Sequence, residues 1–160
     1  MSEVILLTGG NLGDRQGMLA LAREQVARTV GLVKKSSALY ETAAWGNTDQ
    51  PAFLNQVLVV ETALSPESVL EQVLAIEKGL GRKRTDKWGP RSLDIDILFY
   101  DAMVMATAQL TIPHPEIPHR RFVLEPLAEI APDMVHPMLG ISIRDLLAQT
   151  GDGLAVRRLA

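Results

Sequence analysis

Segments with strand-like and with helix-like spacing of apolar residues alternate along the first two thirds of the chain, and their order restricts the fold more than any other feature. Apolar residues that alternate or form short runs predict strands at 4–8, 33–42, 53–62 and 93–100. Apolar residues at helical spacing predict helices at 15–30 and 66–80, each of which follows a capping residue, Asp14 or Ser65. The predicted order is therefore strand, helix, strand, strand, helix, strand.

This order is that of the ferredoxin-like fold (β-α-β-β-α-β), an α+β arrangement in which two helices cover one face of an antiparallel sheet. The sequence further predicts a short edge strand at 109–112 and a C-terminal extension with short helices at 125–130 and 143–150. The segment from 151 onward has no clear pattern. No repeat or linker interrupts the chain, so we expect one domain, 1–160. Many functions use this fold, and function must be inferred from particular residues.

Composition narrows the class of protein. The chain has no cysteine, which excludes disulfides and thiolate metal sites. It also lacks a signal peptide and any apolar run near the ~18 residues that span a membrane, so we expect a cytoplasmic protein. The net charge of −3 argues against a nucleic-acid partner. Six of the sixteen Lys and Arg nevertheless lie between Lys78 and Arg91, which favours a small anionic ligand.

The strand after this basic segment suggests what the ligand is. Asp94 and Asp96 alternate with apolar residues and therefore project from one face of the strand. Neighbouring carboxylates repel unless a cation lies between them, and Mg²⁺ takes one or two carboxylates together with water and phosphates. Arginine side chains match phosphate geometry. Taken alone, aspartates at a strand end or a basic loop are more often solvated surface residues with no binding role. Their adjacency in this chain favours metal-dependent phosphate chemistry.

Other residues allow more than one interpretation. Asn55 shares a strand face with apolar residues: its amide could make a structural turn bond or bind the edge of a planar ligand beside Phe53. Glu77 lies beside the apolar stripe of its helix and is interpreted first as a surface carboxylate, second as a brace for the basic segment. The glycines at 9–13 match no phosphate-loop motif and predict a tight turn. Three widely spaced histidines do not indicate a metal site.

Seven motifs follow one another between Val4 and Pro137: GGNLGDR, YET, QPAFLN, IEKGLGRKR, WGPRSLDIDIL, LTIPHP and RRFVLEPL. In this order they resemble the 6-hydroxymethyl-7,8-dihydropterin pyrophosphokinase family of folate biosynthesis. The segment WGPRSLDID with the later IPH is the most specific. The resemblance implies transfer of the diphosphoryl group of ATP to the hydroxymethyl group of a reduced pterin, which leaves AMP.

The resemblance also implies roles for individual residues. Two Mg²⁺ ions would be held by Asp94 and Asp96, which together with Arg82 and Arg91 are the expected catalytic residues. The implied pterin site comprises Thr42, Ala43, Trp45, Phe53, Asn55 and Phe122. The implied ATP site comprises Glu77, Arg82, Arg84, Trp88, Arg91, Ile97, Thr111, His114 and Arg120. The partners would be these two small molecules, and we expect a monomer. Ala43, Trp45 and Gln109 depart from the residues common in the family.

Two alternatives of other classes remain open at this point. A non-catalytic ferredoxin-like module that binds RNA on its sheet would need exposed aromatic residues on the central strands, but Phe53 is the only aromatic residue in its strand. Another two-metal phosphoryl or nucleotidyl transfer enzyme would use the same aspartates, and a third acidic ligand would be expected. Release of AMP from ATP only in the presence of a reduced pterin separates the three.

Overall fold

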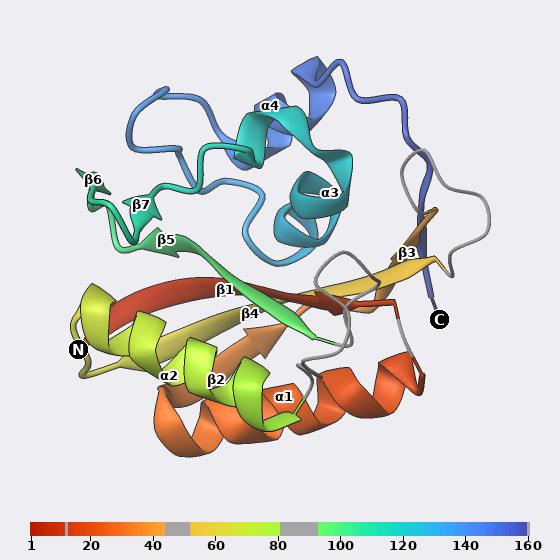
Figure 1. Cartoon of the computed structure of the whole chain (residues 1–160). Coiled ribbons are helices and arrows are strands. Elements are labelled where there is room, and N and C mark those ends of the chain that lie inside the picture. The colour runs from red at the N-terminus through yellow and green to blue at the C-terminus, as the bar shows by residue number, and fades with distance from the viewer. Residues whose placement is uncertain (12, 44–51, 81–92, 160) are drawn as a thin grey trace.

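A computed structural model describes residues 1–11, 13–43, 52–80 and 93–159 (Figure 1). The first part of the chain forms β1 (Ser2–Gly10), α1 (Arg15–Thr29), β2 (Gly31–Ser36), β3 (Tyr40–Thr42), β4 (Phe53–Thr62), α2 (Pro66–Leu80) and β5 (Asp94–Tyr100). The remainder forms β6 (Met105–Ala106), β7 (Thr111–Ile112), a 3-10 turn (Ile117–His119), α3 (Arg121–Ile130), α4 (Ile143–Gln149) and β8 (Val156–Arg158).

The main sheet has six strands in the order β5-β1-β4-β3-β8, with β2 also paired to β4, and every pair in it is antiparallel. The prediction of one strand at 33–42 was wrong, because β2 and β3 pair with opposite ends of β4. Between them the Ser37 backbone N–H donates to the Val57 carbonyl at 2.9 Å, and the Ser37 hydroxyl, in place of a backbone carbonyl, accepts from the Val57 N–H at 3.0 Å.

Helices α1 and α2 lie together on one face of the sheet, as the ferredoxin-like prediction requires (Figure 1). Apolar side chains at helical spacing on both helices meet the alternating apolar residues of β1, β4 and β5 in one buried cluster. Its fully buried members include Leu6, Leu19, Leu54, Leu58 and Leu93. The fold class predicted from the sequence is confirmed.

The other face of the sheet is covered by α3 and α4, so the molecule has three layers (Figure 1). A second buried cluster joins these helices to the sheet and contains Val57 and Val59 of β4 with Leu124 and Leu127 of α3. Helix α3 begins at Arg121, four residues before the start predicted for the helix at 125–130, and contributes buried residues to this second cluster. No helix in the part of the chain that the structure describes is long and apolar enough to cross a membrane.

A buried histidine in the second layer gives the stability of the fold a dependence on pH. His136 is only 5% exposed, meets the Phe99 ring edge-on at 5.7 Å, and accepts hydrogen bonds at Nδ1 from the N–H groups of Met138 and Leu139. Burial lowers the pKa of His136 below its usual 6.5. The unfolded chain therefore binds the proton more readily than the folded protein does.

We expect the free energy of unfolding to fall as the pH drops below about 6.5, because protonation then favours the unfolded state. The contribution of neutral His136 to stability is fully present above this pH. It is lost as the pH falls through the lowered pKa that His136 has in the folded protein. Urea unfolding between pH 5 and 8 checks this. The variant His136→Asn should have a flatter pH dependence, whereas His119→Asn, at an exposed histidine, should retain it. An unchanged slope in His136→Asn would contradict the assignment.

Candidate active site

A cavity of about 290 Å³ lies where five elements of the fold approach one another. We call it the main cavity. Its walls come from β1, β3, β4, β5, the start of α3 and the segment that precedes β8. The lining residues are Leu7, Gly9, Thr42, Ala43, Phe53, Asn55, Asp94, Asp96, Arg120, Phe122 and Leu154. The structure thus brings together eight residues that the sequence resemblance assigned to the pterin, to ATP or to the metal ions.

The two aspartates enter the main cavity from the first half of β5. Strand pairing places Asp94 opposite Gly9 and Asp96 opposite Leu7 of β1. The apolar residues that alternate with them, Ile95 among them, are buried against α1 and α2. Strand geometry separates the two Cα atoms by about 6.6 Å, with both side chains on the cavity side.

This donor set fits a hard cation that shares its coordination with a ligand. In the described part of the chain, no group of three or more His, Asp and Glu side chains is arranged to hold a metal. A cage built only from protein side chains is therefore not present among those residues. Two carboxylates on one wall are what Mg²⁺ uses when water and phosphate oxygens complete its shell.

The position of β5 is supported from α2 by a buried carboxylate. Glu77 is 6% exposed, and its Oε2 accepts a hydrogen bond from the backbone N–H of Ile95 at 2.7 Å. Because β5 is at the edge of the sheet, an N–H that faces away from β1 has no strand partner among the described residues, and Glu77 supplies the acceptor. The interpretation of Glu77 as a surface carboxylate was wrong. Its hydrogen bond is to the residue between Asp94 and Asp96.

A second wall of the main cavity is built around a buried amide. Asn55 of β4 is 7% exposed, and its Nδ2 donates to the Thr8 carbonyl at 3.4 Å. Gly9 lies opposite Asn55, and a Cβ at Gly9 would collide with this amide. The predicted turn at 9–13 was therefore wrong in its first two residues: Gly9 and Gly10 belong to β1, where a missing side chain makes room for Asn55.

Thr42 adds an unsatisfied group to the same wall. Its side chain is 3% exposed, and its hydroxyl oxygen has no hydrogen-bond partner among the residues that the structure describes. An unpaired buried hydroxyl is unfavourable unless a ligand or water completes it. Phe53 and Phe122 line the same cavity. This wall therefore offers aromatic surface with amide and hydroxyl groups beside it, which suits a flat polar ring.

Positive charge comes from the start of α3. The Arg120 guanidinium lies 5.6 Å from the centre of the Phe122 ring and 3.6 Å from the Glu116 carboxylate. It lines the main cavity together with Asp94 and Asp96. The cavity thus combines two carboxylates with one guanidinium, the charges that an anion bound through a divalent cation requires.

Four other predicted site residues do not line the main cavity. Glu77 acts from behind β5, as described above. The Ile97 side chain is buried in the cluster against α1 and α2, so only its backbone could meet a ligand. Thr111 is exposed on β7, and His114 is half-buried, with Nδ1 accepting the Glu116 N–H at 3.2 Å. Trp45, Arg82, Arg84, Trp88 and Arg91 lie outside the described residues.

Three lining residues were not predicted as site residues. The signal for Gly9 was a glycine directly after an apolar run, which was interpreted as a turn. Leu7 was expected only as a residue of the first strand. Leu154 lies in the segment from 151 onward, where the sequence shows no pattern, and pairing between β8 and β3 brings that segment to the cavity.

Comparison with known proteins identifies the family of the chain. The family model described as 7,8-dihydro-6-hydroxymethylpterin-pyrophosphokinase matches residues 5–132. A Methylorubrum extorquens protein named 2-amino-4-hydroxy-6-hydroxymethyldihydropteridine pyrophosphokinase is 45% identical over 150 residues, which cover 93% of this chain and 94% of the relative. An Aquifex aeolicus protein of the same name is 42% identical over 138 residues, which cover 86% of each chain.

The fold is also found among solved structures. The crystal structure titled Plasmodium falciparum HPPK-DHPS wild type matches with a TM-score of 0.75 and 18% identity. The match covers 92% of this chain and 44% of the solved chain, so the chain spans less than half of that structure. Because the family model matches most of the chain and two relatives exceed 40% identity over most of their length, the chain belongs to the 7,8-dihydro-6-hydroxymethylpterin-pyrophosphokinase family.

Proposed function

We propose that this chain transfers the β,γ-diphosphoryl group of ATP to the hydroxymethyl group of 6-hydroxymethyl-7,8-dihydropterin, a step of tetrahydrofolate biosynthesis. The products are AMP and the pterin diphosphate. One observation carries the proposal: a single cavity of about 290 Å³ has an acidic pair on one wall and an aromatic and amide wall beside it. Membership of the family supports the same reaction.

The aromatic and amide wall is the proposed pterin site. A pterin ring is flat and carries hydrogen-bond donors and acceptors along one edge, which Asn55 and Thr42 can pair with. Phe53 and Phe122 supply aromatic surface, and Ala43 completes the wall. Trp45 is included on the sequence resemblance alone. Because the buried Thr42 hydroxyl gains a partner when the ring binds, part of the cost of burying it is recovered.

The acidic wall is the proposed site for the metal-bound phosphates of ATP. Asp94 and Asp96 would hold two Mg²⁺ ions, which when bound neutralise phosphate charge and align the attacking and leaving oxygens. The chain itself fixes the spacing of these carboxylates through β5 and supplies the cation of Arg120. Phosphoryl transfer depends mainly on such positioning and charge compensation.

The remaining ATP contacts are proposed from the resemblance rather than from position. They are Arg82, Arg84, Trp88, Arg91, Ile97, Thr111 and His114, with Arg82 and Arg91 next to the transferred group. Glu77 is proposed to act through Ile95 and not by contact with ATP. We further propose that residues 1–160 form one domain that works as a cytoplasmic monomer, and this rests on the sequence expectations alone. Size-exclusion chromatography tests the monomer.

Product analysis tests the reaction. The protein is incubated with ATP, Mg²⁺ and 6-hydroxymethyl-7,8-dihydropterin, and we expect AMP and pterin diphosphate in equal amounts. ADP as the product would mean transfer of a single phosphoryl group. AMP without any need for the pterin would indicate a nucleotide hydrolase or another two-metal enzyme. If folded protein shows no turnover, the alternative of a non-catalytic binding module would be favoured.

Asn55→Ala should weaken pterin binding by roughly tenfold or more, because a site that pairs with a polar edge loses at least one buried hydrogen bond of about 1–1.5 kcal/mol. The dissociation constant of the pterin, measured by titration calorimetry, checks this, and the KM for ATP should change little. Gln16→Ala, which removes an exposed amide on α1, is the control. Unchanged pterin affinity in Asn55→Ala would return this amide to a purely structural role.

A further inference from the structure

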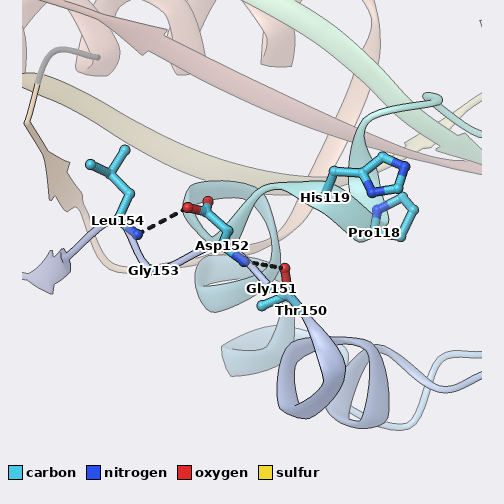
Figure 2. A pocket seen from close by; sticks show the side chains of 7 residues that line it. All are labelled: Pro118, His119, Thr150, Gly151, Asp152, Gly153 and Leu154. Atoms are coloured by element: carbon cyan, nitrogen blue, oxygen red, sulfur yellow. Dashed lines mark hydrogen bonds between the residues drawn. The ribbon is translucent and has the colours of Figure 1, made fainter. Parts of the chain in front are cut away.

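The C-terminal segment contributes a wall to the main cavity that the described function does not use. Residues 150–154 run between two hollows, and Leu154 lines both of them. One hollow is the main cavity. The other, of about 630 Å³, is lined by Pro118, His119 and residues 150–154 (Figure 2). This strip of chain therefore lies between the proposed substrate site and the second hollow.

One carboxylate fixes this strip against α3. Asp152 Oδ2 accepts a hydrogen bond from the backbone N–H of Arg121 at 2.9 Å, and Oδ1 accepts one from the backbone N–H of Leu154 at 2.9 Å. Figure 2 shows the second of these bonds, with the Asp152 side chain turned back toward Leu154. Arg121 Nε also donates to the Asp152 carbonyl at 3.2 Å. The residues on either side of Arg121, which are Arg120 and Phe122, both line the main cavity.

The charge state of Asp152 agrees with this geometry. Hydrogen bonds from the two backbone N–H groups hold the pKa of the Asp152 carboxyl below its usual value. The carboxylate therefore stays ionised throughout the neutral range, and each of its oxygens is available to accept a bond from a different segment.

Strand pairing fixes the far end of the strip. In β8, Val156 lies opposite Thr42 and Arg157 opposite Glu41, and the Arg157 guanidinium contacts the Glu41 carboxylate at 2.9 Å. Because β8 runs antiparallel to β3, the chain that precedes Val156 continues past the Thr42 end of β3. Leu154 therefore reaches the main cavity beside Thr42, on the wall proposed for the pterin and away from the start of β3.

We propose that Leu154 is a binding contact for the flat ring in the main cavity, and that Asp152 is its positioning residue. The two oxygens of Asp152 join the backbone that carries Arg120 and Phe122 to the backbone that carries Leu154. The distance between these two walls of the cavity is therefore fixed. Leu154 presents an apolar surface to the ring. The proposal rests on the proposed function for the identity of the ring.

A purely structural role for Asp152 makes a different prediction. Arg121 is the first residue of α3, and Arg120 at the N-cap makes no side-chain capping bond, so Asp152 also supplies the cap from a distant segment. If capping were its whole role, its loss would lower stability and leave the affinity of the folded protein for the ring unchanged. The ratio of pterin affinity to ATP affinity separates the two roles.

The test compares two variants with two matched controls. Leu154→Ala should raise both the KM and the dissociation constant of 6-hydroxymethyl-7,8-dihydropterin about fourfold, the effect of about one buried methylene group. Asp152→Asn keeps the shape but leaves one N–H facing an amide group, and should raise the same constants roughly three- to tenfold. The KM for ATP and the kcat should stay within about twofold of wild type in both. The controls are Leu139→Ala and Asp133→Asn, both at exposed positions outside the cavity.

Thermal unfolding is followed for all four variants, and affinities are measured well below the lowest midpoint. Unchanged pterin constants in Leu154→Ala, or equal losses for pterin and ATP, would overturn the proposal for Leu154. A lower midpoint with unchanged pterin constants in Asp152→Asn would leave Asp152 as a helix cap only. Calorimetric titration with the pterin does not require turnover. A wild-type protein that binds pterin but forms no AMP would therefore count against the proposed reaction and not against this contact.

Discussion

Asp96→Ala is expected to lower kcat by about a thousandfold or more, because a carboxylate that holds a metal at the transferred group cannot be replaced by a methyl group. The side chain is exposed in the wall of the main cavity, so its removal leaves no void in either apolar cluster. The free energy of unfolding should therefore change by no more than about 0.5 kcal/mol. In this variant kcat should therefore fall while the free energy of unfolding stays almost the same.

Initial rates of AMP formation across a Mg²⁺ titration, together with urea unfolding, provide the measurement. Asp133→Ala is the matched control, since that side chain is exposed and pairs only at the surface with Arg144 at 3.1 Å. We expect the control to keep its rate and its Mg²⁺ dependence. Near-normal turnover in Asp96→Ala would remove Asp96 from the metal site, and a rate restored at high Mg²⁺ would make it a minor ligand.

Where the chain follows a simple period, the sequence was enough to predict both the fold and the faces of its strands. The prediction placed Asn55 on a strand face with apolar residues, and the structure buries two residues of that face, Val57 and Val59, in the cluster beneath α3. It also placed both aspartates of β5 on one face of the strand and Ile95 on the other, and the structure buries Ile95 while the aspartates line the main cavity. Alternation on a strand is a local property, so no distant contact was needed to predict it.

The features that the sequence did not predict depend on contacts between distant segments. The break between β2 and β3 coincides with Ser37, whose hydroxyl accepts a hydrogen bond from the N–H of Val57, twenty residues later. The buried Glu77 carboxylate accepts the Ile95 N–H at the edge of the sheet, a contact that no helical pattern can indicate. Leu154 reaches the main cavity through the pairing of β8 with β3, across more than a hundred residues of sequence, and through the Asp152 bond to Arg121. Such pairings follow from the assembled sheet and not from local composition.

The hydrogen bond from Ile95 to Glu77 gives the second large expected effect. Glu77→Ala should lower the free energy of unfolding by roughly 2–4 kcal/mol, because the variant leaves the buried Ile95 N–H without its acceptor and removes packed methylene groups. The kcat of the folded fraction should fall by about tenfold or more, since a shift of 1 Å in catalytic groups can cost about a hundredfold. Glu71→Ala, at an exposed glutamate of the same helix, should behave as wild type in both assays.

Glu77→Gln separates bracing of β5 from direct contact with ATP, the role that the family resemblance gives to Glu77. If Glu77 acts through Ile95, the glutamine oxygen can accept the same N–H, so stability and the Mg²⁺ dependence of the rate should largely return. If the carboxylate contacts ATP or its metal, glutamine should raise the KM for ATP as much as alanine does while stability returns. Urea unfolding and Mg²⁺ titrations of the two variants distinguish these outcomes. Because Ile95 lies between Asp94 and Asp96, recovery of both properties together would mean that a buried helix carboxylate fixes the spacing of the proposed metal ligands without touching the metal.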